Sequence, residues 1–178
     1  AMSGLFFLFM AVVSVVSVLP LVGTALALAL LPAATLGLMA ATREAANGKF
    51  PMPTVMMVAF RAGQQRLKAM LTLGALYTAS FLLVMGLSAL VDGGGFAKVY
   101  LANAPITPEV VNAADFQMAM WLATVLYIPL SMLFWHSPAL VHWHGVPPVK
   151  SMFFSAVACW RNLGAFAVYL LAWAGVFV

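Results

Sequence analysis

The chain has 178 residues, of which 65% are hydrophobic and only 7% are charged, and its formal net charge is +4. Soluble domains carry about 25% charged residues, so this composition excludes a water-covered globular protein and places the chain in a bilayer. The positive charge is explained by one side of a membrane protein, which excludes nucleic acid as a partner. The single cysteine excludes an internal disulfide framework.

The length predicts one all-α, polytopic membrane domain over residues 1–178, with about five transmembrane helices of about 20 residues each. No basic segment precedes the first apolar run, so no signal peptide is predicted. Both ends lie within apolar sequence, and we expect the chain to continue beyond each of them in a longer protein.

Residues 5–41 form an apolar stretch that would be about 55–60 Å long as one helix. A hydrocarbon core is about 30 Å thick, so one straight span is excluded. Pro20 lacks the N–H that a helix needs and predicts a break. Two interpretations stay open: two spans joined by a tight turn at Leu19 and Pro20, or one kinked span with a re-entrant piece.

Small residues recur at every fourth position in the second half of this stretch, and we call them the small-residue ladder: Ala25, Ala29, Ala33, Gly37 and Ala41. Small residues at this spacing let two helix backbones approach closely, which favours helix association in lipid. The ladder therefore predicts a helix–helix contact, within the chain or with another membrane protein. Abundant alanine alone would give the same pattern.

The segment 43–68 is the most basic part of the chain, with five of the eight Lys and Arg residues. Glycine and proline residues at 48–53 break the chain, and a new helix is predicted from Thr54. The polar residues predicted on one face of that helix are Arg61, Gln64, Gln65 and Lys68. A basic amphipathic helix at a membrane edge lies in the interface, which would place Arg61, Arg66 and Lys68 at the membrane surface, or it docks on other helices of the same protein. Both interpretations stay open.

Two further spans are predicted at 69–91 and 116–135, because both segments are uncharged and long enough to cross a bilayer. The segment between them, 92–115, begins with Asp92 and three glycines, which end a helix sharply. Trp121 and Trp135 lie near the ends of the second of these spans, where indole rings favour the headgroup level.

The segment 136–161 is the third polar region, and helix is predicted to resume near Val149 as a second interfacial helix. Ser151, Ser155 and Cys159 form a weakly polar stripe on this helix. Arg161 ends the region, at a position where an arginine can reach the membrane surface. A fifth span is predicted from Leu163 past the last residue.

The histidines His136, His142 and His144 are the candidate cofactor ligands. His142 and His144 diverge on a helix but converge in an extended loop, where a histidine can ligate haem or another pigment. No cysteine or carboxylate lies nearby in sequence, so no metal site is predicted. The simpler interpretation is an interfacial cluster of histidine and tryptophan, and no cofactor is predicted.

The charge distribution predicts the topology. The segments 43–68 and 136–161 hold seven of the eight basic residues, whereas the segment 92–115 has a net charge of −2. Basic residues accumulate in cytoplasmic loops, so both basic segments are assigned to the cytoplasm and 92–115 to the periplasm. A weak parallel internal repeat is also indicated, because Pro53 precedes Arg66 and Pro148 precedes Arg161 by the same spacing.

Several short motifs spread over most of the chain resemble an uncharacterised proteobacterial multi-pass inner-membrane protein family. They are GLMA at 37–40, FR at 60–61, LGALY at 73–77, FW at 134–135, PALV at 138–141, HGVP at 144–147 and ACWRN at 158–162, with Pro32, Gly48 and Pro51 at their own positions. The resemblance implies a helical membrane fold in a bacterial inner membrane. It implies no activity and no catalytic residue.

The sequence predicts a protein that is not an enzyme. All four carboxylates lie in the predicted loops, and the chain has no Gly-rich phosphate loop, no HExxH and no Gly-x-Ser-x-Gly motif. The first functional prediction is an accessory or assembly subunit that packs against other membrane proteins or itself, for example in a respiratory or photosynthetic complex. The alternatives are a small transporter or lipid-handling protein, and a haem- or pigment-binding subunit.

Overall fold

The computed structural model describes residues 4–177 apart from 6, 8–9, 12–13 and 16–21. Within these residues the chain forms helices joined by turns, and no strand is present. The helices are α2 (Val22–Ala46), η1 (Pro53–Met57), α3 (Val58–Arg61), α4 (Gln64–Asp92), α5 (Gly95–Ala102), α6 (Pro108–Asn112), α7 (Ala114–Phe134), α8 (Ser137–His144), α9 (Pro148–Arg161) and α10 (Leu163–Phe177). The predicted all-α membrane architecture is confirmed.

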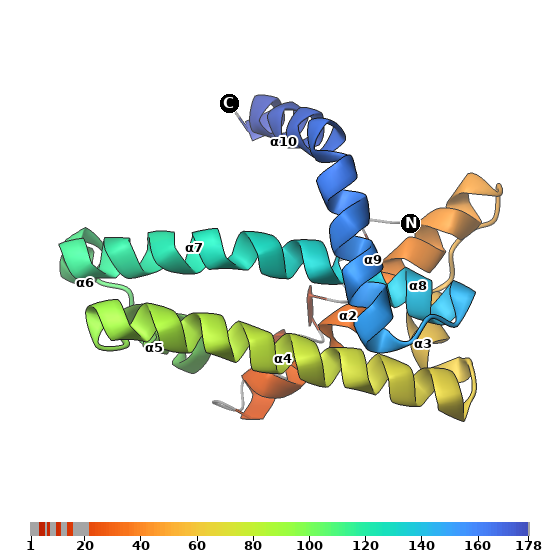
Figure 1. Cartoon of the computed structure of the whole chain (residues 1–178), viewed down its shortest axis with the longest axis horizontal. Helices are drawn as coiled ribbons and strands as arrows, with labels where there is room; N and C mark the ends of the chain where they lie inside the picture. The colour runs from red at the N-terminus through yellow and green to blue at the C-terminus, as the bar shows by residue number, and fades with distance from the viewer. Residues whose placement is uncertain (1–3, 6, 8–9, 12–13, 16–21, 178) are drawn as a thin grey trace.

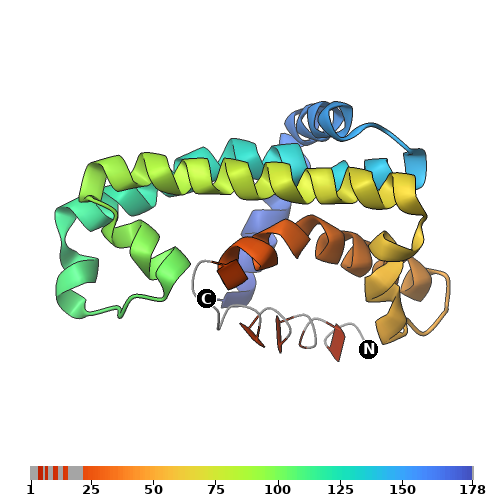
Figure 2. The ribbon, with the colours of Figure 1, turned by 90° about the horizontal axis from the view of Figure 1, so that it is seen from below.

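Helix α4 is the centre of the molecule. It packs against both α7 and α2: Figure 1 shows α4 and α7 side by side, and Figure 2 shows α2 next to α4. Among the described residues, three segments are long and apolar enough to cross a membrane: Val22–Ala46, Gln64–Asp92 and Ala114–His144. The bent pair α9 and α10 is a candidate for a fourth span. The predicted span at 5–19 and its break at Pro20 lie mostly outside the described residues.

The chain places its charged connections at opposite ends of α4. Residues 43–63 and α8 lie at the end where α4 begins, and α5 and α6 lie at the end where it finishes (Figure 1). We call these the basic end and the acidic end. The two segments predicted to share one side of the membrane thus meet at the start of α4, while the assignment of that side to the cytoplasm stays a prediction.

Close backbone contact joins α2 to its neighbours. A Cβ atom at Gly74 of α4 would collide with the carbonyl group of Ala29 in α2, and one at Gly37 would lie 2.9 Å from the Cα of Met56. Glycine at these positions therefore permits an approach that any larger residue would prevent.

The predicted interfacial helix from Thr54 is wrong as a single helix. The chain forms the short helices η1 and α3, and Gly63 then separates Arg61 from Gln64 with a φ of +90°, which favours glycine. Arg61 therefore does not share a helix face with Gln64, Gln65 and Lys68, which belong to α4.

A break between α7 and α8 is bridged by Ser155 of α9. The amide of His136 donates to Ser155 Oγ at 2.9 Å, and the Ser155 hydroxyl donates to the Met132 carbonyl at 2.7 Å. These two backbone groups would bond to each other in an unbroken helix. The polar stripe of α9 thus faces α7 and α8, with Ser151, Ser155 and Cys159 buried.

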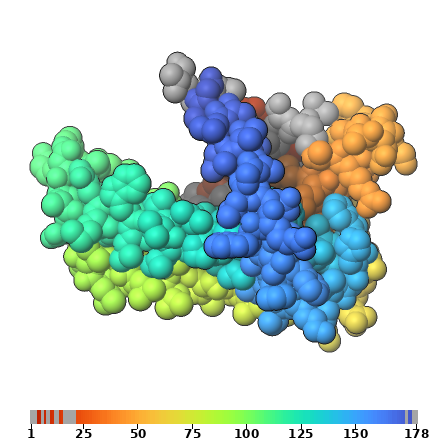
Figure 3. Space-filling view, turned by 45° about the horizontal axis from the view of Figure 1, so that its top comes forward, coloured from red at the N-terminus to blue at the C-terminus, as the bar shows by residue number. Residues whose placement is uncertain are grey.

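Helix α9 runs across α7 near the end of α7 rather than alongside it (Figure 1). A bend of 72° then leads into α10, which has 15 residues and projects from the bundle (Figure 3). The described side chains of α10 are exposed apart from the half-buried Phe166, whose ring meets Trp135 edge to face at 5.3 Å. The fifth predicted span thus begins at the expected residue, and among the described helices α9 is its main neighbour.

Candidate functional site: an apolar cavity between the helices

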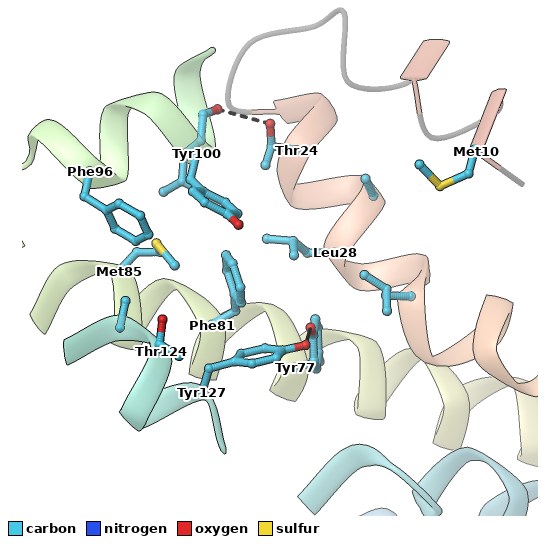
Figure 4. Close-up of a pocket in the computed structure, with 14 residues that line it drawn as sticks. Met10, Thr24, Leu28, Tyr77, Phe81, Met85, Phe96, Tyr100, Thr124 and Tyr127 are labelled. Atoms are coloured by element: carbon cyan, nitrogen blue, oxygen red, sulfur yellow. Dashed lines mark hydrogen bonds between the residues drawn. The ribbon is translucent and has the colours of Figure 1, made fainter. Parts of the chain in front are cut away.

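A cavity of about 520 Å³ lies between α2, α4, α5 and α7 (Figure 4). Its lining is mostly apolar and aromatic: Met10, Thr24, Ala27, Leu28, Leu31, Tyr77, Phe81, Met85, Phe96, Tyr100, Leu101, Ala123, Thr124 and Tyr127. Small-molecule sites in proteins are commonly concave, of roughly 300–1,000 Å³, and lined mainly by apolar and aromatic groups with a few polar ones. The size and lining of this cavity fit that description.

Helical periodicity explains why α4 supplies one wall. Tyr77, Phe81 and Met85 are four residues apart, so they lie on one face of α4. Tyr77 and Phe81 stack with ring centroids 6.2 Å apart. Tyr77 also meets Phe134 of α7 edge to face, with ring centroids 5.1 Å apart, and this contact holds Tyr77 against α7. Tyr77 and Met85 are buried, so their side chains have fixed surroundings within the bundle.

Two tyrosine hydroxyls form a polar group on the wall of the cavity. The hydroxyl oxygens of Tyr77 and Tyr127 are 3.2 Å apart and share a hydrogen bond between α4 and α7. Tyr77 lies thirteen residues after the start of α4 and fifteen before its end, and Tyr127 lies thirteen after the start of α7. The pair is therefore about 20 Å from the acidic end, close to the middle of a span.

The threonine hydroxyls at the cavity are bonded to backbone carbonyls. Thr24 donates to the Leu101 carbonyl at 3.1 Å, which ties the start of α2 to the end of α5, and Thr124 donates to Met120 within α7 at 2.8 Å. Tyr100 points its ring into the cavity from α5 (Figure 4). The polar groups are thus few and separate, in an otherwise apolar enclosure.

Asp92 positions the part of α5 that lines the cavity. Its carboxylate accepts a bond from the Gly94 amide at 2.9 Å and another from the Phe96 amide at 2.6 Å. A carboxylate at the start of a helix satisfies amides that have no partner in the helix. These bonds turn α5 back from the end of α4 toward the start of α2, as Figure 2 shows. Phe96 and Tyr100 consequently line the cavity.

The three candidate histidines lie at the basic end, away from the cavity. His142 and His144 belong to helix α8, where they diverge: His142 is buried and His144 is exposed. His136 precedes this helix and uses its amide to bond Ser155. The structure therefore does not bring the histidines together, and the described residues contain no group of three His, Cys, Asp or Glu side chains placed to hold a metal ion.

The same end contains a contact that sequence analysis did not identify. The Arg43 guanidinium lies 5.2 Å from the ring centroid of Trp143, which joins the last turn of α2 to α8. A cation over an indole face contributes about 0.5–2 kcal/mol, more where water is excluded. This contact holds α8 against α2, and the predicted membrane-surface residues Arg61, Arg66, Lys68 and Arg161 remain exposed.

The small-residue ladder faces the interior over part of its length. Ala33, Gly37 and Ala41 are buried, and Ala25 and Ala29 are half-buried. Ala29 meets Gly74 of α4, and Gly37 meets Met56 of η1. The neighbours of these two ladder residues thus belong to the same chain, and whether the ladder also contacts another protein stays a prediction.

The cavity residues were not identified from the sequence. The spacing of Tyr77, Phe81 and Met85 carries a signal, since it places aromatic and polarizable side chains on one helix face. That signal alone does not distinguish a cavity wall from ordinary core packing. Tyr127 could be paired with Tyr77 only after the relative position of α4 and α7 was known.

These features define an all-α, multi-pass membrane protein with an apolar cavity that lies between its helices and opens to the surface. No family model and no solved structure matches the chain. The chain is 43% identical over 172 residues to a protein of Burkholderia thailandensis described as a probable inner membrane protein. The aligned region covers 95% of this chain and 64% of that relative, so the chain spans less than two thirds of the relative's length.

This similarity agrees with the expected resemblance to an uncharacterised proteobacterial inner-membrane protein family. It confirms the location in the bacterial inner membrane, together with the long apolar helices.

Proposed function

We propose that the protein is a non-enzymatic, lipid-handling membrane protein that binds an apolar molecule in the cavity between α2, α4, α5 and α7. The cavity itself carries this proposal: about 520 Å³ of space remains in the part of the bundle that surrounds Tyr77 and Tyr127. The pocket opens to the surface, since Tyr100 and Tyr127 of its lining are exposed, so an apolar molecule from the bilayer can enter it.

Lipid extraction with a matched pair of variants tests this function. Ala123→Leu adds bulk to the cavity wall, whereas Ala79→Leu adds the same bulk on the exposed face of α4. The protein purified in mild detergent is expected to retain an apolar molecule that mass spectrometry detects. The amount should fall in Ala123→Leu and stay unchanged in Ala79→Leu. Equal amounts in all three proteins, or none in any, would contradict the proposal.

A second candidate function is that of an accessory or assembly subunit, and the position of α10 favours it. This helix is apolar and projects from the bundle, and Val168, Leu170 and Leu171 are exposed. Its first turn meets Trp135 through Phe166. A projecting helix of this kind can pack against a neighbouring membrane protein by dispersion contacts.

Purification in mild detergent also tests the second candidate. The wild type is expected to self-associate or to retain another membrane protein, and Val168→Ser with Leu171→Ser should reduce this association. A stable monomer that retains no partner would count against an accessory role, while the lipid content measured above would be unaffected. The haem- or pigment-binding alternative gains no support from the separated histidines and stays a prediction.

A further inference from the structure

We infer that the molecule in the cavity carries a carbonyl group on an apolar skeleton, and that its carbonyl oxygen accepts a hydrogen bond from the Tyr77–Tyr127 hydroxyl pair. This inference rests on the proposed function and specifies its ligand. The chemistry that fits best is a planar, carbonyl-bearing ring with an apolar tail, as found in isoprenoid quinones. The inference concerns binding and includes no redox step.

The tyrosine pair has one more O–H proton than its shared hydrogen bond uses. Two phenol groups bring two O–H protons, and the bond between Tyr77 and Tyr127 uses one of them. Neither hydroxyl forms a second hydrogen bond with the described residues. In a hydrocarbon environment an unpaired donor is costly, since no water satisfies it. A carbonyl oxygen brought in by the ligand would accept this proton.

Aromatic rings make up much of the cavity wall around the tyrosine pair. Phe81, Phe96 and Tyr100 face the same space as the tyrosine pair (Figure 4). Phe81 meets Tyr127 edge to face at 6.2 Å, and Phe96 meets Tyr100 at 5.1 Å. Aromatic side chains favour stacked and edge-to-face neighbours, so this enclosure suits a planar ring better than a disordered acyl chain.

The depth of the tyrosine pair in the bilayer distinguishes a phospholipid ester carbonyl from a quinone carbonyl. Phospholipids carry ester carbonyls near the headgroups, at the edge of a hydrocarbon core about 30 Å thick. The tyrosine pair lies about 20 Å from the acidic end of α4, well inside that core. A phospholipid in its ordinary position would bring only methylene groups to this depth. A quinone ring is not tied to the headgroup level and can reach the pair.

Binding measurements with two ligands and two proteins test the inference. Detergent-purified protein is titrated with a short-tailed benzoquinone and with an alkylbenzene of the same tail that lacks both carbonyls. The proteins are the wild type and Tyr77→Phe/Tyr127→Phe, which keeps both rings and removes both hydroxyls. The wild type is expected to bind the quinone about tenfold more tightly than the double variant does, since a hydrogen bond in a dry site contributes about 1–1.5 kcal/mol. The alkylbenzene should bind both proteins equally.

The control is Tyr169→Phe, which removes a tyrosine hydroxyl on α10, outside the cavity, and should bind the quinone as the wild type does. Thermal unfolding of each variant shows whether the fold is intact. Equal quinone binding by the wild type and the double variant would overturn the carbonyl contact. The contact would also be overturned if the double variant lost as much affinity for the alkylbenzene as for the quinone.

The outcome also separates this inference from the proposed function. If Ala123→Leu removes a co-purified phospholipid and no quinone binds, the cavity handles phospholipid and the ring chemistry is wrong. If no apolar molecule depends on Ala123, both the ligand class and the lipid-handling function are wrong.

Discussion

Ser155 illustrates how one small side chain can complete the hydrogen bonding of a neighbouring helix. Its hydroxyl stands between the His136 amide and the Met132 carbonyl, which the break between α7 and α8 has separated. In lipid no water is present to hydrogen-bond these backbone groups, so their partners must come from the protein. The serine is fully buried. Among the described residues, the one other side-chain bond to these two groups is a weak one from the Cys159 thiol to the Met132 carbonyl, at 3.7 Å.

We predict that Ser155→Ala destabilises the protein by about 1–3 kcal/mol, because it leaves the part-buried His136 amide without a partner and the Met132 carbonyl with only the weak Cys159 thiol donor. Thermal unfolding in detergent measures the effect. Ser131→Ala is the control, since the Ser131 hydroxyl bonds only to the Ile128 carbonyl within α7. Equal melting temperatures for the two variants would show that the bridge contributes nothing specific.

Gly74 and Gly86 offer a second comparison between single residues of α4. A Cβ at Gly74 would meet the Ala29 carbonyl, whereas one at Gly86 would meet nothing within 4 Å. Gly74→Ala is therefore expected to cost about 1–3 kcal/mol by overpacking. Gly86→Ala should be neutral or stabilise the helix by up to about 1 kcal/mol. Unfolding of both variants checks the prediction, which fails if Gly74→Ala is as stable as Gly86→Ala.

At the scale of elements, the sequence predicts the long helices well and their arrangement poorly. The span predicted at 116–135 matches α7, and the span predicted at 69–91 lies within α4, because charge and glycine mark these ends directly. The break at Gly63 was missed, since its neighbours alone are compatible with one helix. The cavity was missed because it depends on which faces of separate helices meet, a property that periodicity within one helix does not contain.

The small-residue ladder of α2 gives the prediction at this scale. Gly37→Leu with Ala33→Leu should force α2 away from its neighbours and cost roughly 1–3 kcal/mol, because both positions are buried and Gly37 touches the backbone of Met56. Insertion, assembly state and thermal unfolding are the measurements. Leu26→Ala, at an exposed position of α2, is the control and should have little effect. If the double variant inserts, assembles and melts as the wild type does, the ladder is not a packing contact and its spacing reflects only the abundance of alanine.

At the scale of the whole molecule, charge separates the two ends of the bundle. Residues 43–63 and α8 gather at the basic end, and 92–113 lie at the other (Figure 1). At the acidic end, a hydrogen bond from the Thr107 side chain lowers the pKa of the Glu109 carboxyl. Sequence alone predicted this separation, because the loops alternate in charge along the chain and successive spans reverse direction.

Cysteine labelling in intact cells tests which end faces the cytoplasm. Cys159 is the only cysteine in the sequence, so Cys159→Ser gives a background into which single cysteines can be placed. Lys49 is exposed at the basic end and Ile106 at the acidic end, which makes Lys49→Cys and Ile106→Cys a matched pair. Basic loops remain in the cytoplasm, so a membrane-impermeant maleimide should label Ile106→Cys in intact cells and Lys49→Cys only after lysis. The reverse labelling would invert the topology. It would also place the cavity in the half of the bilayer nearer the cytoplasm, because Phe96, Tyr100 and Leu101 line the cavity from the acidic end.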